Sequence, residues 1–390
     1  MANTYKLYGI PCSLYTAKAR SYLRKKKINF SEFAVSDAHY QKSVVPKIGR
    51  MIMPVLESSD GEIIQDSADI IRYLEEQHTA VNPVLPDTPL LQAVSHLFEL
   101  FGGEGLLRPA MHYRWNFDDV NLDYLRSEFQ CLAPQSSNQA TYQQIFEFGS
   151  GRMRKAAKSF GVTAHSSSAI EASYLEFLNL LSAHLRDFPY LLGGRATLGD
   201  YALMGPLFAH LYRDPKPGLL MRQHAPLVAR WVERMNTAED SWADHPNQSQ
   251  KLISGDTLPD TLIALMRYIA EEYLPEISAH ISYTNNWLAE RPELAPGTNG
   301  LDDPTQRFIG NIEFPWRGIT LKTSVVPYRF YLLQDLHELY DGLENMDRKH
   351  IEGVFTECGL ECILTSRLRR RLERRNYLEV WGDDIAPSIG

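Results

Sequence analysis

Cysteine is scarce in this sequence: four residues among 390, namely Cys12, Cys131, Cys358 and Cys362. So few thiols do not make a disulfide framework at this length, because such frameworks belong to small secreted domains. Cys358 and Cys362 have no histidine close by, and two ligands alone do not make a zinc site. The cysteine usage therefore predicts a reducing, cytoplasmic environment, and no metal is expected.

Long apolar runs and a surplus of positive charge are also missing. No apolar run approaches the ~20 residues of a membrane-spanning helix, and no basic segment followed by an apolar one stands at the N-terminus. The formal net charge of −8 gives no reason to expect a nucleic-acid partner. We therefore predict a soluble protein with no membrane and no nucleic-acid partner. A chain of 390 residues suits two or three domains.

The first part of the chain alternates between strand and helix patterns. Tyr5-Lys6-Leu7-Tyr8 alternates apolar and polar side chains, as a strand does. Ile70, Ile71 and Leu74 share one face of a helix that opens near residues 65–67. The predicted strands lie at about 5–8, 28–33, 53–57 and 63–64, with helices at about 16–27 and 65–76. The resulting order is β-α-β-(α)-β-β-α.

Three segments in this region resemble the N-terminal thioredoxin-like domain of the cytosolic glutathione transferases. The first is Pro11-Cys12-Ser13-Leu14-Tyr15-Thr16-Ala17-Lys18-Ala19-Arg20, which follows the first strand. The second is Met53-Pro54, where the family has a cis-proline. The third is Gln65-Asp66-Ser67-Ala68-Asp69-Ile70-Ile71-Arg72-Tyr73-Leu74. The resemblance implies an α/β thioredoxin-like domain, followed by an all-α domain of the glutathione transferase type.

The residues up to about 245 fit this division into two domains, and the chain then continues beyond the second domain. A proline-containing linker covers about 78–88, and Thr197 with Asp200 forms a capping box that opens a helix in the second part. We predict a thioredoxin-like domain at 1–79, a helical domain at 88–245 and a mostly helical extension at 250–390. In the extension we expect helices at about 257–288, 328–342 and 349–377, with short strands at 307–309 and 319–321. The family resemblance does not account for the extension.

Two neighbouring residues, Ser13 and Cys12, are alternative candidates for the catalytic role. Ser13 matches the position of the family's catalytic Ser or Cys, which donates a hydrogen bond to the glutathione sulfur and lowers the pKa of the thiol. Such help is needed because a free thiol, with a pKa near ~8.5, is mostly protonated at neutral pH. Ser13 could instead only cap the first helix. Cys12 could contact glutathione and transfer thiols, or be a buried, inert thiol.

The resemblance also implies which residues hold glutathione. Ser67 and the backbone donors at the helix start suit the γ-glutamyl carboxylate, while Asp66, or Gln65, takes the ammonium. Met53, just before Pro54, would bond the cysteinyl backbone through its own N–H and C=O. Arg50, or Lys47, is the candidate for the glycyl carboxylate.

A second pocket for an acceptor molecule is expected between the two domains. Its candidate lining combines aromatic and basic side chains: Tyr15, Arg108, His112, Tyr113, Arg114 and Trp115. The same side chains could equally make hydrogen bonds between helices or contacts in a dimer. A loop at 314–318 is a candidate lid, and 367–375 reads as an amphipathic surface helix with an arginine face.

These residues lead to a glutathione transferase-like hypothesis. Glutathione, activated as thiolate by Ser13 or Cys12, would attack a small apolar or aromatic electrophile, with no metal, in a homodimer. One alternative is a non-catalytic binding or interaction protein that keeps the fold. Others are a glutathione-dependent lyase, isomerase or reductive dehalogenase, or a thiol transferase using Cys12.

Overall fold

The computed structural model describes residues 4–78, 82–239, 242–246, 249–254 and 257–385. Its first part is a four-stranded sheet in the order β2-β1-β3-β4, from β1 (Tyr5–Gly9), β2 (Phe30–Ala34), β3 (Val55–Glu57) and β4 (Ile63–Gln65). β1 runs parallel to β2 and antiparallel to β3. Helices α1 (Leu14–Lys25) and α3 (Ser67–Gln77) pack on this sheet. A π-helical turn (Tyr40–Val44) and α2 (Val45–Ile48) connect β2 to β3.

The sheet confirms the predicted order of elements and the thioredoxin-like fold. The Met53–Pro54 peptide bond is cis, as the resemblance implied. Apolar residues of α1 and α3, among them Leu23, Ile70 and Leu74, are fully buried against the sheet. Burying a side chain of this size stabilises the fold by roughly 1.5–3 kcal/mol, so this layer holds α3 firmly against the sheet.

The second part is all-helical. It contains α4 (Pro89–Leu100), a π-helical turn (Phe101–Gly105), α5 (Leu107–Trp115), α6 (Asp118–Phe129), α7 (Gln139–Ser159), α8 (Ser167–Asp187), α9 (Leu198–Ala209), α10 (Pro215–His224) and α11 (Pro226–Met235). Every residue of α9 is buried, and this helix packs against α1 and α4. The capping box of Thr197 and Asp200 is present at its start, as predicted, and Asp200 also accepts the Leu191 N–H at 3.0 Å.

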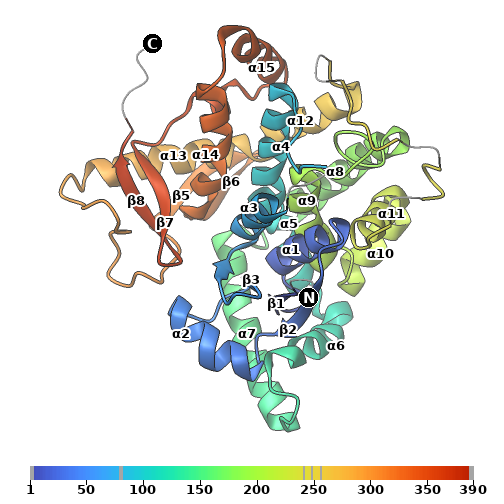
Figure 1. Cartoon of the computed structure of the whole chain (residues 1–390), viewed down its shortest axis with the longest axis vertical. Helices are drawn as coiled ribbons and strands as arrows, with labels where there is room; N and C mark the ends of the chain where they lie inside the picture. The colour runs from blue at the N-terminus through green and yellow to red at the C-terminus, as the bar shows by residue number, and fades with distance from the viewer. Residues whose placement is uncertain (1–3, 79–81, 240–241, 247–248, 255–256, 386–390) are drawn as a thin grey trace.

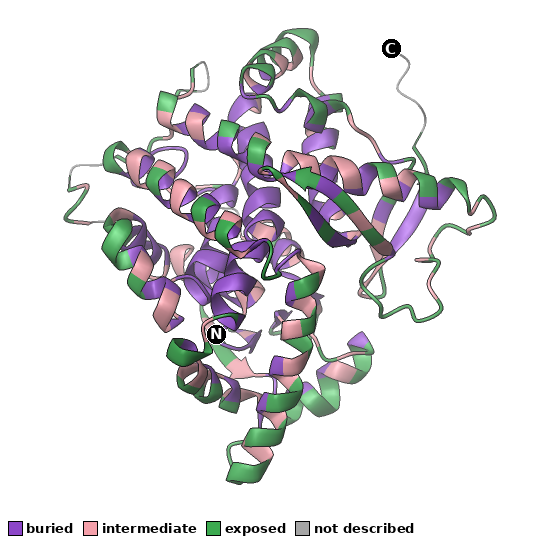
Figure 2. Cartoon of the chain, turned by 180° about the vertical axis from the view of Figure 1, so that it is seen from behind, coloured by how far each residue is buried: buried purple, intermediate pink, exposed green. Residues whose placement is uncertain are grey.

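The extension is built of helices and two hairpins. It consists of α12 (Asp260–Glu272), α13 (Leu274–Ala289), β5 (Gly310–Trp316), β6 (Ile319–Val325), α14 (Tyr328–Asp341), α15 (Asn345–Glu357), α16 (Glu361–Thr365), β7 (Arg370–Arg375) and β8 (Leu378–Asp384). In Figure 1 it lies against α3 and α4, and the β7–β8 hairpin reaches down beside α3. Most of its buried side chains form one cluster with those of the helical part, whose buried centre is purple in Figure 2, while Phe314, Trp316 and Leu321 belong to a second cluster.

Several predictions about the extension are wrong. The strand expected at 307–309 lies instead at 310–316, and the helix expected at 257–288 is divided into α12 and α13. Residues 367–375 do not form a basic helix: most of them belong to β7, in which buried Arg370 and Leu372 flank exposed Arg371. The predicted helix at 349–377 is therefore divided into α15, α16 and this strand. Residues 314–318 are not a loop, because β5 and β6 pair up to Trp316 and Ile319, so that only Arg317 and Gly318 make the turn. Both turn residues have positive φ, which is the geometry of a tight hairpin.

No helix in the described ranges combines the length and the apolar character needed to cross a bilayer.

Candidate functional site

Ser13 stands at the N-terminus of α1, in the loop that follows β1. It is half-buried, and its Oγ accepts the N–H of Thr16 at 3.3 Å. A serine hydroxyl has a donor hydrogen in addition to its acceptor lone pairs. Because capping the helix uses only an acceptor lone pair, the O–H remains available to donate to a ligand. Capping α1 and hydrogen bonding to a thiolate are therefore compatible roles for Ser13.

Cys12 is in a different environment. Its side chain is 3% exposed, and burial raises the pKa of its thiol, although Arg114 works in the opposite direction. Arg114 donates to the Cys12 carbonyl oxygen at 3.0 Å and fixes the backbone there. A raised pKa reduces the thiolate fraction, and burial limits access to the sulfur. This environment suits an inert packing cysteine better than a nucleophile.

Asp66 and Ser67 lie where β4 passes into α3. Asp66 has φ 91°, its N–H donates to the Pro54 carbonyl at 3.2 Å, and its Oδ1 caps α3 by accepting the Ala68 N–H at 2.9 Å. The Oγ of Ser67 is buried and has no hydrogen-bond partner in the structure. A buried hydroxyl without a partner costs free energy, and this one stands in the first turn of a helix, where anions bind. The arrangement suits a ligand carboxylate.

Met53 and Arg50 border the same region from the other side. Met53 is half-buried and precedes the cis-proline. The carbonyl of Pro54 already accepts a hydrogen bond from the Asp66 N–H. Arg50 donates through Nη2 to the backbone oxygen of Tyr377 at 2.8 Å. Its Nε is buried without a hydrogen-bond partner. The structure therefore brings Arg50 to the extension, a contact that the sequence did not predict.

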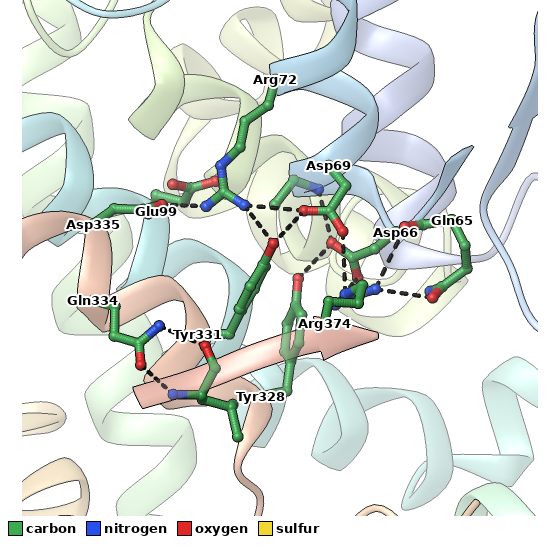
Figure 3. A network of polar contacts seen from close by, with 12 residues as sticks. Gln65, Asp66, Asp69, Arg72, Glu99, Tyr328, Tyr331, Gln334, Asp335 and Arg374 are labelled. Carbon is green, nitrogen blue, oxygen red and sulfur yellow. Dashed lines mark hydrogen bonds and ion pairs between the residues drawn. The ribbon is translucent and has the colours of Figure 1, made fainter. Parts of the chain in front are cut away.

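Arg374 of β7 makes the main contact between the extension and this region (Figure 3). Its Nη1 donates to the side-chain oxygen of Gln65 at 2.8 Å, its Nε lies 3.1 Å from Asp69, and its Nη2 lies 3.9 Å from Asp66. From α14, the Tyr328 hydroxyl donates to Asp66 Oδ1 at 2.8 Å. No sequence pattern predicts these partners, and residues 367–375 were expected to form a surface helix.

The residues predicted to line an acceptor pocket are mostly paired inside the helical part. Arg114 forms a two-pronged ion pair with Asp214, both bonds at 2.7 Å, and His112 Nε2 lies 3.0 Å from Glu171. Tyr113 stacks on Phe117. These contacts favour the interhelix interpretation that the sequence left open. Four of the α5 candidates are nearly inaccessible, each at most 3% exposed: His112, Tyr113, Arg114 and Trp115.

The other two candidates of that pocket, Arg108 and Tyr15, are also engaged. Arg108 is 2% exposed and forms ion pairs with Glu272, at 3.1 Å, and with Glu276. Tyr15 is half-buried and donates to Glu104 Oε1 at 2.8 Å. Of the set, Tyr15 alone lies in the first turn of α1, close in sequence to Ser13.

The expected lid at 314–318 is wrong. Trp316 is 2% exposed, and its Nε1 donates to the Glu272 backbone oxygen at 3.0 Å. Arg317, at the turn, pairs with Glu272 at 2.7 Å and with Glu176 at 2.8 Å. The hairpin is thus fixed to α8 and α12 as part of the core.

One group in the described residues has the side chains to hold a metal ion: His96, Glu99 and Asp335, whose ligand atoms lie within 4.8 Å of one another. Both carboxylates already have a cation, however. Lys18 Nζ lies 2.7 Å from Glu99, and Arg72 binds Asp335. Because these pairs already balance the two negative charges, we interpret the group as an ion-pair network between α1, α3, α4 and α14.

The fold and the site together define a class. A thioredoxin-like sheet with a cis-proline, a hydroxyl at the start of α1 and an unpartnered serine at the start of α3 is joined to an all-helical part. Residues 7–82 match the family described as glutathione S-transferase, N-terminal domain, and residues 166–239 match glutathione S-transferase, C-terminal domain. The chain is a member of the glutathione S-transferase superfamily, with a long C-terminal extension.

Solved structures of this superfamily resemble the chain at low identity. A glutathione S-transferase from Methylobacterium radiotolerans, in complex with glutathione sulfonate, is 20% identical with a TM-score of 0.36, covering 64% of this chain and 98% of its own. The beta-etherase LigF from Sphingobium sp. strain SYK-6 is 18% identical with a TM-score of 0.43, covering 60% and 95%. A Ceriporiopsis subvermispora enzyme in complex with glutathione is 21% identical with a TM-score of 0.38, covering 61% and 99%. No curated protein matches the sequence.

Proposed function

We propose that the protein is a glutathione-dependent transferase that uses Ser13 to hold glutathione as a thiolate. The Ser13 O–H donates to the sulfur, and the positive end of α1 favours the negative charge. The thiolate attacks a small apolar or aromatic electrophile, so that a carbon–sulfur bond forms while the bond to the leaving group breaks. The observation that carries this proposal is the capping geometry of Ser13, which leaves its hydrogen free.

In this proposal glutathione lies along the edge formed by the ends of β3 and β4. Ser67 binds the γ-glutamyl carboxylate through an Oγ that has no other partner, and Asp66 with Gln65 binds the ammonium. The main chain of Met53, before Pro54, bonds the cysteinyl unit, and Arg50 binds the glycyl carboxylate. No step requires a metal. Residues 1–79 then bind glutathione, 88–245 complete the acceptor pocket, and the extension at 250–390 modifies the dimer interface. The protein acts in the cytoplasm as a homodimer.

A specific observation supports a second candidate, a binding protein that keeps the fold without catalysis. Arg374 and Tyr328 already contact the Asp66 carboxylate that the ligand ammonium would use. If these contacts are permanent, glutathione loses one of its partners. The thiol-transferase alternative through Cys12 has less support, because burial raises the pKa of that thiol.

Calorimetric titration of glutathione separates these functions. The wild type is expected to bind, and Ser67→Ala to bind about 10- to 100-fold more weakly, because a hydrogen bond to a charged group contributes roughly 1.5–3 kcal/mol. Ser31→Ala, at an exposed position of β2, is the matched control and is expected to bind as the wild type does. No heat from either the wild type or a variant that lacks the Arg374 contact, at concentrations well above those of a cell, would exclude the transferase.

The role of Ser13 has a separate test. Ser13→Ala is expected to bind glutathione but to lose the ultraviolet absorbance of bound thiolate, because the donor to sulfur is gone. Since Ser13 also caps α1, the alanine variant is expected to lose about 1 kcal/mol of stability as well. Ser13→Thr keeps the hydroxyl and the cap, so it is expected to retain the absorbance. Loss of the absorbance in Cys12→Ala, with retention in Ser13→Ala, would assign the activation to Cys12.

A further inference from the structure

The β7–β8 hairpin, which we call the C-terminal hairpin (Arg370–Asp384), contacts both ends of the proposed glutathione site. At one end, the Arg374 guanidinium bonds Gln65 at 2.8 Å and approaches Asp66 to 3.9 Å. At the other end, the backbone oxygen of Tyr377, in the hairpin turn, accepts from Arg50 at 2.8 Å. Two residues of one short hairpin thus engage side chains on opposite sides of the site.

The chemistry of these two contacts matches that of glutathione. Arg374 brings a cation within 3.9 Å of Asp66, the carboxylate that would receive the ligand ammonium, while its nearest carboxylate is that of Asp69, at 3.1 Å. Tyr377 places an oxygen acceptor on the guanidinium that would receive the ligand glycyl carboxylate. The hairpin therefore presents a positively charged donor where the ammonium of glutathione would lie. It presents an oxygen acceptor where the glycyl carboxylate of glutathione would lie.

The contacts also close the amino end of the site. Asp66 is 7% exposed and Ser67 1% exposed, with Tyr328 hydrogen-bonded to Asp66. The Ser67 Oγ is buried and still has no hydrogen-bond partner. Bulk solvent does not reach it, so a ligand can bind it only after a covering side chain moves. At Asp66, the closed hairpin and the ammonium of a bound γ-glutamyl group compete for the same carboxylate, because Arg374 already approaches it.

The hairpin is fixed at its base. Its tip is held by the polar contacts of Arg374 and Tyr377 and by packing of the Tyr377 ring against apolar side chains. At the base, Gln334 of α14 bonds the backbone of Leu372 twice, at 2.9 and 2.6 Å, and Leu372 and Trp381 are buried. At the tip, Asn376 and Tyr377 both have positive φ and form the tight turn. A two-stranded ribbon beyond its anchored base is marginally stable alone, so the tip can move while the base stays in place.

We propose that the C-terminal hairpin is an intramolecular cover of the glutathione site, in which Arg374 and the Tyr377 carbonyl occupy the positions of the amino and glycyl ends of glutathione. Glutathione binds when the tip lifts. The inference depends on the proposed function, because it assigns the covered residues to that ligand. The apparent affinity is then the intrinsic affinity reduced by the fraction of molecules with the cover open.

Titration of reduced glutathione into a variant that lacks the Arg374 side chain tests whether the C-terminal hairpin covers the site. Arg374→Ala is expected to lower the apparent Kd about tenfold or more, because the open fraction rises. Arg371→Ala is the matched control on the same strand: Arg371 is exposed and pairs with Glu338, away from the site, so its Kd is expected to equal that of the wild type. Arg374→Gln, which keeps a polar side chain, serves if the alanine variant does not fold.

Hydrogen exchange gives an independent readout. Saturating glutathione is expected to speed amide exchange at the hairpin tip, residues 373–379, and to leave α14 unchanged. If the wild type binds glutathione, and Arg374→Ala and Arg374→Gln bind it equally or more weakly, the cover is wrong and Arg374 is at most part of the binding site. If wild type, Arg374→Ala and Arg374→Gln all fail to bind, the proposed function fails and the cover with it.

Discussion

Replacing Arg329 by alanine is expected to lower the free energy of unfolding by about 3–5 kcal/mol, because removing one partner of a buried ion pair leaves the other charge buried without compensation. Arg329, on α14, is 1% exposed and binds Glu276 of α13, with Glu104 at 3.5 Å. Burial acts to raise the pKa of Glu276, but Arg329 and Arg108 outweigh it and lower the pKa to about 2. Without Arg329, Glu104 loses its ion-pair partner in a buried position.

Urea denaturation measures this effect, and two variants serve as controls. Lys322→Ala removes an exposed partner of Glu313, at 3.5 Å, and is expected to change stability by less than about 1 kcal/mol. Arg329→Lys keeps a positive charge beside Glu276 and Glu104 and is expected to recover part of the loss. A loss below about 1 kcal/mol for Arg329→Ala would show that the network does not hold the extension to the rest of the chain.

The thioredoxin-like part could be predicted because its signals are local. Strand alternation, the helix start at residues 65–67 and the Met53–Pro54 pair each lie within a few consecutive residues. The capping box of Thr197 and Asp200 is equally local, since both members lie within one helical turn. Short segments of this kind specify their conformation almost by themselves.

The C-terminal hairpin could not be predicted in the same way. Leu364, Leu368 and Leu372 repeat every fourth residue, and a spacing of four fits both one face of a helix and one face of a strand. Tertiary contacts decide the outcome, since Gln334 pairs with the backbone of Leu372. The Asn376-Tyr377 turn was a weak local signal, because asparagine tolerates positive φ.

The candidate site shows the same division between local and distant information. Ser13, Asp66 and Ser67 could be placed on helix starts from the sequence, and the structure places them there. Arg374, by contrast, lies 309 residues from Gln65 along the chain, and no pattern in the sequence connects the two. Composition could also not separate a binding role from an ion-pair role for Arg114, because both roles use a guanidinium.

Acidification is expected to destabilise the protein through buried neutral histidines. Burial lowers the pKa of His184 to about 4, and the same cause, with Arg367 adding to it, lowers that of His337 to about 4. In the unfolded chain both take up a proton below about pH 6.5. The unfolded state then binds more protons, so the free energy of unfolding falls as the pH drops from about 6.5 towards 4. Between pH 7 and 5 each histidine costs roughly 2 kcal/mol.

Histidine variants separate this destabilisation from the opposite effect of buried carboxyl groups. Buried carboxyl groups such as Asp200, whose pKa burial raises to about 6, take up protons in the folded state and partly compensate in the wild type. We therefore compare unfolding at pH 7 and pH 5 in the wild type, His184→Gln and His337→Gln. Each variant is expected to lose roughly 2 kcal/mol less than the wild type over that interval. His350→Gln, at an exposed position, should follow the wild type. Equal losses of unfolding free energy in all four proteins would mean that His184 and His337 are protonated in the folded state too. Their burial would then not cause the destabilisation at low pH.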